Sequence, residues 1–328
     1  MKKIGCLLLV IVIGIIGFIS YKKLNVENSS LTKIKVAEVT HSIFYAPFYV
    51  AIENGYFEEL GIDIELILTP GADKVSAAVL SGDVQVGLAG SESTVYVYAA
   101  HEEDYLINFA GLTKRDGQFI MARNKIDAFS TDNLIGKHVL VGRKGGMPAL
   151  SFENALNNTG VNPKTVNMDY SVEFAALVGA FIGGNGDFVN LFEPSATKLE
   201  KEGYAYVVAS VGELSGEVPY TSFYSRKSYL NDNKILLEKF SAAIETGLRY
   251  VREQDAKVVA NDILKQFPDS SLTDLTTMIE RHKDYDSWWE VPTIPESAFN
   301  NLLEIMIDSK QIDAYVPYND LVSNLYKK

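Results

Sequence analysis

Polar side chains gather where apolar strands are predicted to end. Ser91 and Glu92 follow one such strand and begin a helix, and Asn190 and Glu193 stand at the end of a later strand. Serine caps and free backbone N–H groups at a helix start hold anions, whereas a carboxylate there selects a cation or an N–H donor. This pattern predicts a site for a small molecule. Glu92 has an alternative role, which is to complement the helix dipole, and Glu193 has the alternative role of capping a helix.

Aromatic residues occupy two further positions of this predicted site. His41 and Tyr45 lie in the turn after the first strand, and Tyr220 follows a proline where the chain is expected to pass between two lobes. Aromatic faces stack on planar ligands and exclude water, so we expect these three side chains to contact the ligand. The alternative is that the rings belong to the hydrophobic core.

A glycine-rich turn, RKGGMP at 143–148, is the best candidate for binding an anion. Gly145 and Gly146 let the backbone approach a ligand closely, and a proline after Met147 suits the first turn of a helix. The spacing is not that of a P-loop. Ala72 lies in a comparable turn before an earlier helix. A plain tight turn is the alternative at 143–148.

Strands and helices alternate along the chain in a pattern that brings strand-end residues such as Glu92 to one edge of a sheet. The stretch 33–90 reads as strand, helix, strand, helix, strand, which is typical of a parallel α/β sheet, where ligands bind at the carboxyl ends of the strands. A second series of strands and helices spans 132–225, and helical apolar spacing alone follows it. We therefore expect two lobes joined by a two-stranded hinge, with the ligand cleft between them. The predicted segments are a membrane anchor or signal at 1–23, a tether at 24–32, lobe I at 33–122 plus 226–328, and lobe II at 123–225.

Composition and charge exclude several classes of protein. The chain has 328 residues, 47% of them apolar, and this fits a globular protein of two domains. A formal net charge of −12 with no basic stripe argues against nucleic-acid binding. The single cysteine, Cys6, allows no disulfide within the chain, and the histidines lack paired ligand spacing. We expect no metal and no cofactor.

The N-terminus has the features of a targeting segment. Lys2 and Lys3 precede an apolar run at 4–19, and Lys22 and Lys23 follow it. The run is slightly long for a signal-peptide core of about 7–15 residues and short for a membrane span of about 20. We favour an uncleaved anchor over a cleaved signal. Either reading places the remaining chain outside the cytoplasm, tethered to the outer face of the cytoplasmic membrane or secreted.

The stretch HSIFYAPFYVAIENGYFEELGIDIEL at 41–66, followed by SGDVQVGLAG at 81–90, resembles a known family of binding proteins. These are the extracytoplasmic substrate-binding proteins of ABC importers, in the branch that serves nitrate, sulfonates, taurine and thiamine-pyrimidine precursors. LIGK at 134–137 and FEP at 192–194 extend the resemblance into the second half. It implies an α/β, two-lobed, periplasmic-binding-protein-like fold of type II, and it implies that the strand end at Glu193 meets the ligand.

The resemblance also implies a function and partners. We expect a monomeric, non-enzymatic protein that captures a small-molecule ligand and delivers it to an ABC permease and its ATPase. Two candidate carboxylates favour a nitrogen-bearing or zwitterionic ligand over a sulfonate or nitrate, although acidic residues occur at these strand ends in anion-binding relatives too. A membrane-tethered sensing ectodomain is one alternative. A pyrimidine-precursor enzyme of the same fold is another, but Cys6 lies outside the fold and cannot supply the cysteine motif of such enzymes.

Overall fold

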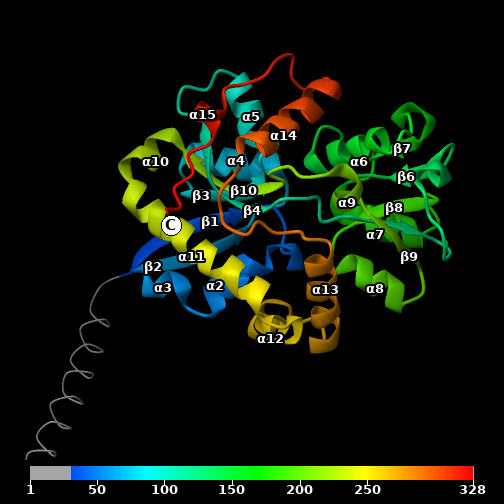
Figure 1. The fold of residues 1–328 in the computed structure, drawn as a ribbon, viewed down its shortest axis with the longest axis horizontal. Coiled ribbons are helices and arrows are strands. Elements are labelled where there is room, and N and C mark those ends of the chain that lie inside the picture. The colour runs from blue at the N-terminus through cyan, green and yellow to red at the C-terminus, as the bar shows by residue number, and fades with distance from the viewer. Residues whose placement is uncertain (1–30, 328) are drawn as a thin grey trace, which may run out of the picture.

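The computed structural model describes residues 31–327, which form two five-stranded sheets (Figure 1). The first sheet has the order β2-β1-β3-β10-β4, and the second has the order β7-β6-β8-β5-β9. The strands of the first sheet are β1 (Thr32–Glu38), β2 (Ile62–Leu68), β3 (Val86–Gly90), β4 (Leu106–Thr113) and β10 (Thr221–Arg226). Those of the second are β5 (Phe119–Ala122), β6 (His138–Leu140), β7 (Asn167–Asp169), β8 (Phe188–Leu191) and β9 (Tyr206–Ser210).

Both sheets mix parallel and antiparallel pairs. Strand β1 pairs in parallel with β2 and β3, as predicted for residues 33–90, and β10 runs antiparallel between β3 and β4. In the second sheet β6 is parallel to β7 and β8, whereas β5 is antiparallel to β8 and β9. The same arrangement of a parallel trio and an antiparallel return strand therefore occurs twice, which fits the two-lobed α/β fold expected from the sequence.

Helices connect the parallel strands and cover the faces of the sheets. Those joined to the first sheet are η1 (Ile43–Tyr45), α2 (Ala46–Glu53), α3 (Tyr56–Glu59), α4 (Ala72–Ser81) and α5 (Glu92–Ala99). Those joined to the second are η2 (Thr131–Leu134), α6 (Met147–Asn158), η3 (Pro163–Thr165), η4 (Phe174–Ala176), α7 (Leu177–Ile182), α8 (Ser195–Lys201) and α9 (Val211–Ser215). In each parallel connection, the carboxyl end of a strand is followed by the start of a helix. Ligands bind at this position in such sheets.

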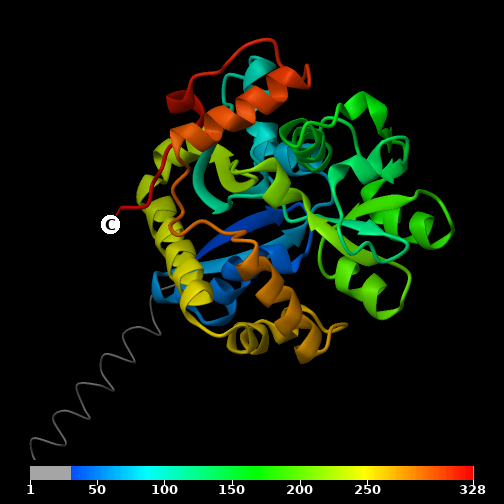
Figure 2. The same ribbon diagram turned by 45° about the vertical axis from the view of Figure 1, so that its right-hand side comes forward.

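The chain after β10 is helical, as predicted. Its elements are α10 (Lys227–Asp232), α11 (Lys234–Glu253), α12 (Ala256–Asp262), η5 (Leu264–Gln266), α13 (Leu272–Asp284), α14 (Glu296–Asp308) and α15 (Tyr318–Leu321). Figures 1 and 2 show α11 along the first sheet, with α12 and α13 leading towards α8 of the second. Apolar side chains of α11, α13 and α14 join the largest core cluster with those of the first sheet. The C-terminal helices therefore pack on the first sheet.

Helix α11 packs against α2 through a close approach at Gly247. A Cβ on Gly247 would overlap the carbonyl oxygen of Pro47, which cannot move without distorting α2. We expect Gly247→Ala to lower the free energy of unfolding by about 2 kcal/mol, the usual cost of overpacking. Urea unfolding measures this change. Gly179→Ala is the matched control, because a Cβ there meets no atom within 4 Å; an equal loss in both variants would contradict the packing argument.

The chain passes between the two sheets twice. Residues 114–118 connect β4 to β5, and residues 216–220 connect α9 to β10. Both connections come a few residues before the positions expected from the sequence, because β5 belongs to the second sheet and β10 to the first. We call them the first and second crossings. The division into lobes at 122/123 and 225/226 stays a prediction.

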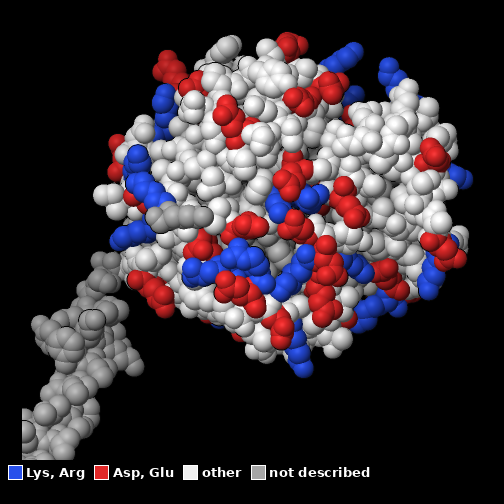
Figure 3. Space-filling model, in the orientation of Figure 1, with Lys and Arg blue, Asp and Glu red and all other residues white. Residues whose placement is uncertain are grey.

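Acidic and basic side chains are intermixed on the face drawn in Figure 3. Among the described residues, no helix is long and apolar enough to cross a membrane. The predicted anchor or signal at 1–23 lies outside the described residues.

Candidate functional site

Eleven residues have a buried side-chain nitrogen or oxygen atom without a hydrogen-bond partner among residues 31–327. Six of them lie near strand ends, in the first half of a helix or in the two crossings, and each of these six is at most 3% exposed. We call these six the unpartnered set: Glu92, Asp116, Gln118, Ser151, Asn190 and Tyr220. The other five are Glu53, Arg115, Ser215, His282 and Trp289. Because buried polar groups in native proteins nearly always find partners, such a concentration indicates a place where a ligand supplies the missing bonds.

Glu92 is the central member of the set from the first sheet. It begins α5 directly after β3, and its Oε1 accepts a hydrogen bond from the Met147 N–H at 3.3 Å, whereas Oε2 has no partner in the described chain. Burial raises the pKa of Glu92 to about 7, and nearby N–H groups and Arg143 offset only part of this effect. A Cβ on Gly90 would overlap the Glu92 carboxylate, so a larger residue there would displace this side chain.

Tyr45 and Tyr220 bring aromatic surface to Glu92. Burial raises the pKa of Tyr45, with further contributions from the charges of Glu38 and Glu92. The pKa of Tyr220 is raised by burial and then by the charges of Asp116 and Glu92. The charge of Glu92 therefore affects both phenols.

The aromatic side chains form one continuous surface, which we call the aromatic wall: Phe44, Phe192 and Tyr220. The ring centroids of Phe44 lie 5.8 Å from those of Phe192 and 5.6 Å from those of Tyr220, and Phe192 lies 6.3 Å from Tyr220. Phe44 comes from η1, Phe192 from the end of β8 and Tyr220 from the second crossing. Elements of both sheets therefore contribute to one apolar surface.

The second sheet supplies the neutral polar members of the set. Asn190 lies on β8 with both side-chain polar atoms unpartnered within the described chain, and Ser151 lies on α6 with its hydroxyl in the same state. Gln118 immediately precedes β5, which pairs with β8. Amides and hydroxyls both donate and accept, so they suit a ligand with mixed hydrogen-bonding groups.

The glycine-rich turn meets the first sheet. The Tyr96 hydroxyl donates to the Gly145 carbonyl at 2.7 Å, Gly146 is the N-cap of α6, and the Met147 N–H is directed at Glu92. The N–H group expected to hold an anion thus faces a carboxylate. The turn contacts the Ala72 end of α4 through Arg143 and Asp73, whose side chains lie 3.2 Å apart and are exposed.

Two predicted ligand residues are engaged within the chain instead. The Nδ1 of His41 lies 2.7 Å from Glu38 Oε1 and its Nε2 lies 3.0 Å from the Gln266 carbonyl; the bond to Glu38 raises the pKa of His41. Glu193 Oε1 accepts from Arg281 Nη1 at 2.6 Å and its Oε2 accepts from the Thr197 N–H at 2.9 Å. Neither side chain belongs to the unpartnered set.

The structure therefore groups some of the predicted positions and separates others. Contacts or charge effects connect Tyr45, Glu92, Met147 and Tyr220, with Asn190 in the same unpartnered set. Ser91 and Gly146 stand one position from members of this group, and Gly145 stands two positions away. The Ser91 hydroxyl is bonded to that of Ser222 at 2.8 Å. His41 and Glu193 have partners within the described chain, and Ala72 lies at the start of α4. Asp116, Gln118 and Ser151 were not predicted.

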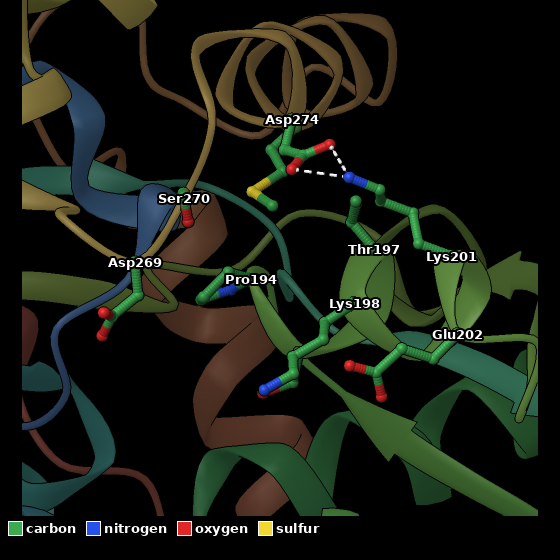
Figure 4. A pocket seen from close by; sticks show the side chains of 10 residues that line it. Pro194, Thr197, Lys198, Lys201, Glu202, Asp269, Ser270 and Asp274 are labelled. Atoms are coloured by element: carbon green, nitrogen blue, oxygen red, sulfur yellow. Dashed lines mark hydrogen bonds and ion pairs between the residues drawn. The ribbon is translucent and has the colours of Figure 1, made fainter.

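A surface cavity of 620 Å³ lies between α8 and α13 and does not contain the unpartnered set (Figure 4). Lys201 and Asp274 pair across it, with Nζ 2.8 Å from Oδ1. Its lining residues are Pro194, Ser195, Thr197, Lys198, Lys201, Glu202, Asp269, Ser270, Asp274 and Met278. Because the charges here are exposed to water or paired, this cavity has less need of a ligand than the buried set, and we place the candidate site at the buried set.

Metal-binding side chains do not gather in the part of the chain that the structure describes. No group of three or more histidine, cysteine, aspartate or glutamate side chains there is placed to hold a metal ion. The chemistry of the unpartnered set is that of hydrogen bonding, ion pairing and aromatic contact.

Comparisons with known proteins identify the family and the fold of the chain. Residues 43–257 match the family described as NMT1/THI5 like. A Bacillus subtilis (strain 168) protein named "Putative binding protein YtlA" is 42% identical over 298 residues, which cover 90% of this chain and 89% of the relative.

Solved structures share the fold at low sequence identity. The alkanesulfonate-binding protein SsuA from Xanthomonas axonopodis pv. citri, bound to MOPS, superposes with a TM-score of 0.70 at 15% identity, covering 89% of this chain and 98% of that one. The ligand-binding component of an ABC-type import system from Staphylococcus aureus, with zinc bound, has a TM-score of 0.70 at 14% identity, covering 90% and 98%. The resemblance and the fold class predicted from the sequence are confirmed. The chain belongs to the NMT1/THI5-like family and has the fold of the substrate-binding proteins of ABC importers.

Proposed function

We propose that this protein is the extracytoplasmic substrate-binding component of an ABC importer and that it captures a nitrogen-bearing cation. The unpartnered Oε2 of Glu92, buried at a strand end, carries the proposal. A buried carboxylate without a cation is unfavourable, and a protonated amine or amidine relieves it by charge and hydrogen bonding together. The ligand would be delivered to a membrane permease driven by its ATPase.

The same observation disfavours a sulfonate or nitrate. Such an anion would meet Glu92 and Asp116, two buried carboxyl groups, and the Met147 N–H, the donor expected to bind an anion, is already directed at Glu92. An aminopyrimidine or another organic amine fits better, because its ring or carbon frame can lie on the aromatic wall while its nitrogen meets Glu92. The acidic body of the protein also attracts cations to the site.

A ligand screen by thermal shift on the full chain tests this proposal, since a ligand that binds only the native state raises the melting temperature. The probes are aminopyrimidines, alkylamines, taurine, alkanesulfonates and nitrate. We expect an amine or aminopyrimidine to bind, and Glu92→Gln to weaken its affinity at least about tenfold, as for loss of a buried charge partner. Glu59→Gln, at an exposed glutamate on α3, is the control. Binding of a sulfonate that survives Glu92→Gln would refute the cation assignment.

Import and sensing are separated by the genetic neighbourhood and by uptake. Genes for a permease and an ATPase beside this one favour import, and deletion of the gene would then abolish uptake of the bound ligand. Normal uptake in the deletion strain would favour the sensing ectodomain.

A further inference from the structure

This inference rests on the proposed function and concerns two side-chain amides, those of Gln118 and Asn190. Both residues are 0% exposed. In both, the amide nitrogen and the amide oxygen are without a hydrogen-bond partner within residues 31–327. An amide does not titrate, so a change of protonation cannot relieve this state as it can for a buried carboxyl group. Each amide therefore needs a partner from outside the described chain.

The pairing of β5 with β8 places the two amides on the same face of the second sheet. Asn190 lies directly opposite Ile120 in this antiparallel pair, so both side chains point to one face. Gln118 precedes Ile120 by two residues, and its carbonyl accepts from the Val211 N–H at 3.0 Å, which continues the pairing of β5 with β9. Alternation along the extended chain turns Gln118 to that face too. Gln118 and Asn190 are then diagonal neighbours, about 7–8 Å apart, and one ligand group can reach both.

Helix α6 covers the face that carries the amides. Ile120 belongs to a core cluster with Phe152 of α6, whereas Phe119, next to Gln118, belongs to a different cluster. The same helix begins at Met147, whose N–H donates to Glu92 at 3.3 Å. A single helix therefore connects the Glu92 carboxylate with the face of the second sheet on which the amides lie.

The aromatic wall begins two residues after Asn190. Phe192 is separated from Asn190 by about 7 Å of extended chain and alternates to the same side. Its ring centroid lies 5.8 Å from that of Phe44 and 6.3 Å from that of Tyr220. A ligand group bonded to Asn190 would therefore have the apolar surface of the wall beside it, as a flat group requires.

We propose that Gln118 and Asn190 form a subsite for an uncharged amide-type group of the ligand, such as a carboxamide, a urea or a lactam. Such a group carries a donor and an acceptor side by side, and each of the two side chains offers the complementary acceptor and donor. A carboxylate or sulfonate would use only the two NH₂ groups and leave both amide oxygens unpaired. It would also approach Asp116, whose Oδ1 accepts from the Gln118 N–H at 2.6 Å.

Matched benzylamines test the subsite by titration calorimetry on the full chain. The probes are meta- and para-(aminomethyl)benzamide, and each is compared with the benzylamine that carries a methyl group, a methyl ester or a carboxylate at the same ring position. We expect at least one amide to bind at least about tenfold more tightly than its three comparators, because a site built to hydrogen-bond a group rejects analogues that lack it. Asn190→Leu and Gln118→Met should each reduce this preference, whereas Asn157→Leu, at an exposed position on α6, should keep it.

The ligand-free variants give a second readout. Asn190→Leu replaces an amide that lacks partners in the described fold by an apolar group of similar size, so the melting temperature should stay the same or rise. Asn108→Leu is the matched control, since Asn108 on β4 is also 0% exposed. Its amide nitrogen donates to the Thr94 hydroxyl and the Leu321 carbonyl, and its oxygen accepts from the Ser222 hydroxyl, so this variant should melt at a lower temperature. An equal decrease in both variants would show that ordered water already satisfies Asn190, and the subsite would be wrong.

The calorimetric outcomes separate this inference from the proposed function. An amide preference smaller than about tenfold, or one that survives the variants at both Gln118 and Asn190, would refute the subsite. If amines still bind under those results and lose affinity in Glu92→Gln, the proposed function stands without it. If no amine binds, with or without an amide group, both fail.

Discussion

Replacing Arg281 with methionine is expected to lower the free energy of unfolding by about 4 kcal/mol, the usual cost of leaving a buried charge unpaired. Arg281, on α13, donates to Glu193 Oε1 at 2.6 Å and to Glu200 Oε2 at 2.7 Å. The Glu193 side chain is fully buried, so without Arg281 only Thr197 would remain to stabilise its charge. Burial already raises the pKa of Glu193 against the opposing effect of Arg281, and loss of Arg281 would raise that pKa further.

Urea unfolding near neutral pH measures the effect of Arg281→Met. Lys201→Met is the matched control, since Lys201 pairs with Asp274 across the same helices but its side chain is 58% exposed. Such an exposed pair contributes about 0–1 kcal/mol. Adding Glu193→Gln to Arg281→Met should recover much of the loss. A change as small as that of Lys201→Met would show that Glu193 is not charged in the folded protein.

Without ligand, Glu92→Gln is expected to stabilise the protein at alkaline pH. The folded-state pKa of Glu92, about 7, lies above its ordinary value of 4.5. The folded state therefore binds this proton more tightly than the unfolded state, and the resulting stability is full below about pH 4.5 and is lost as pH rises through about 7. At about pH 8 the wild-type protein carries a buried charge that glutamine lacks, and the difference is up to about 3 kcal/mol.

Unfolding free energies of the two proteins from about pH 5 to pH 8 test this linkage. The curves should lie close together at the acidic end and separate as the pH rises, with the Gln variant more stable. Glu59→Gln should follow the wild type, because that side chain is exposed. Parallel curves for wild type and Glu92→Gln would show that the Glu92 pKa is not raised. The same residue would thus weaken the ligand-free fold and bind the ligand, a trade-off common at binding sites.

Local patterns in the sequence sufficed to predict the main fold. The alternation at 33–90 corresponds to β1, β2 and β3 with helices between them, because each element carries its own apolar period and turn. The crossings were harder to place, since QFIMAR at 118–123 is an apolar strand that either sheet could take up. Its antiparallel pairing with β8 and β9 depends on contacts distant in sequence.

The site was predictable where a residue stands at a strand end. Glu92 and Tyr45 follow strands of the first sheet, and both are buried. Asp116 lies within KRDGQ, a charged stretch that reads as an exposed turn. It is buried because Gly212, from α9, approaches so closely that a Cβ there would overlap the Asp116 backbone. Ser151 sits inside a helix, where a lone serine gives no signal.

Distant partners also decided the position of Glu193. Its neighbours in the sequence suggest a strand-end carboxylate facing a ligand, and Arg281 is 88 residues away. No local pattern indicates that this arginine reaches it. The pairing makes Glu193 a connection between the second sheet and α13, which is why we propose Glu92 as the ligand-binding carboxylate.

The chain enters and leaves the second sheet at neighbouring points, because Phe119 at the start of β5 pairs with Ser210 at the end of β9. Residues 119–210 are therefore a segment inserted into the part of the chain that forms the first sheet. Ser151 and Asn190 belong to the inserted segment, whereas the other members of the unpartnered set belong to the first-sheet part or to the crossings. If the proposed site binds the ligand, recombination between relatives at these two points would combine new neutral contacts with the existing Glu92, so that the two parts of ligand specificity would be separable.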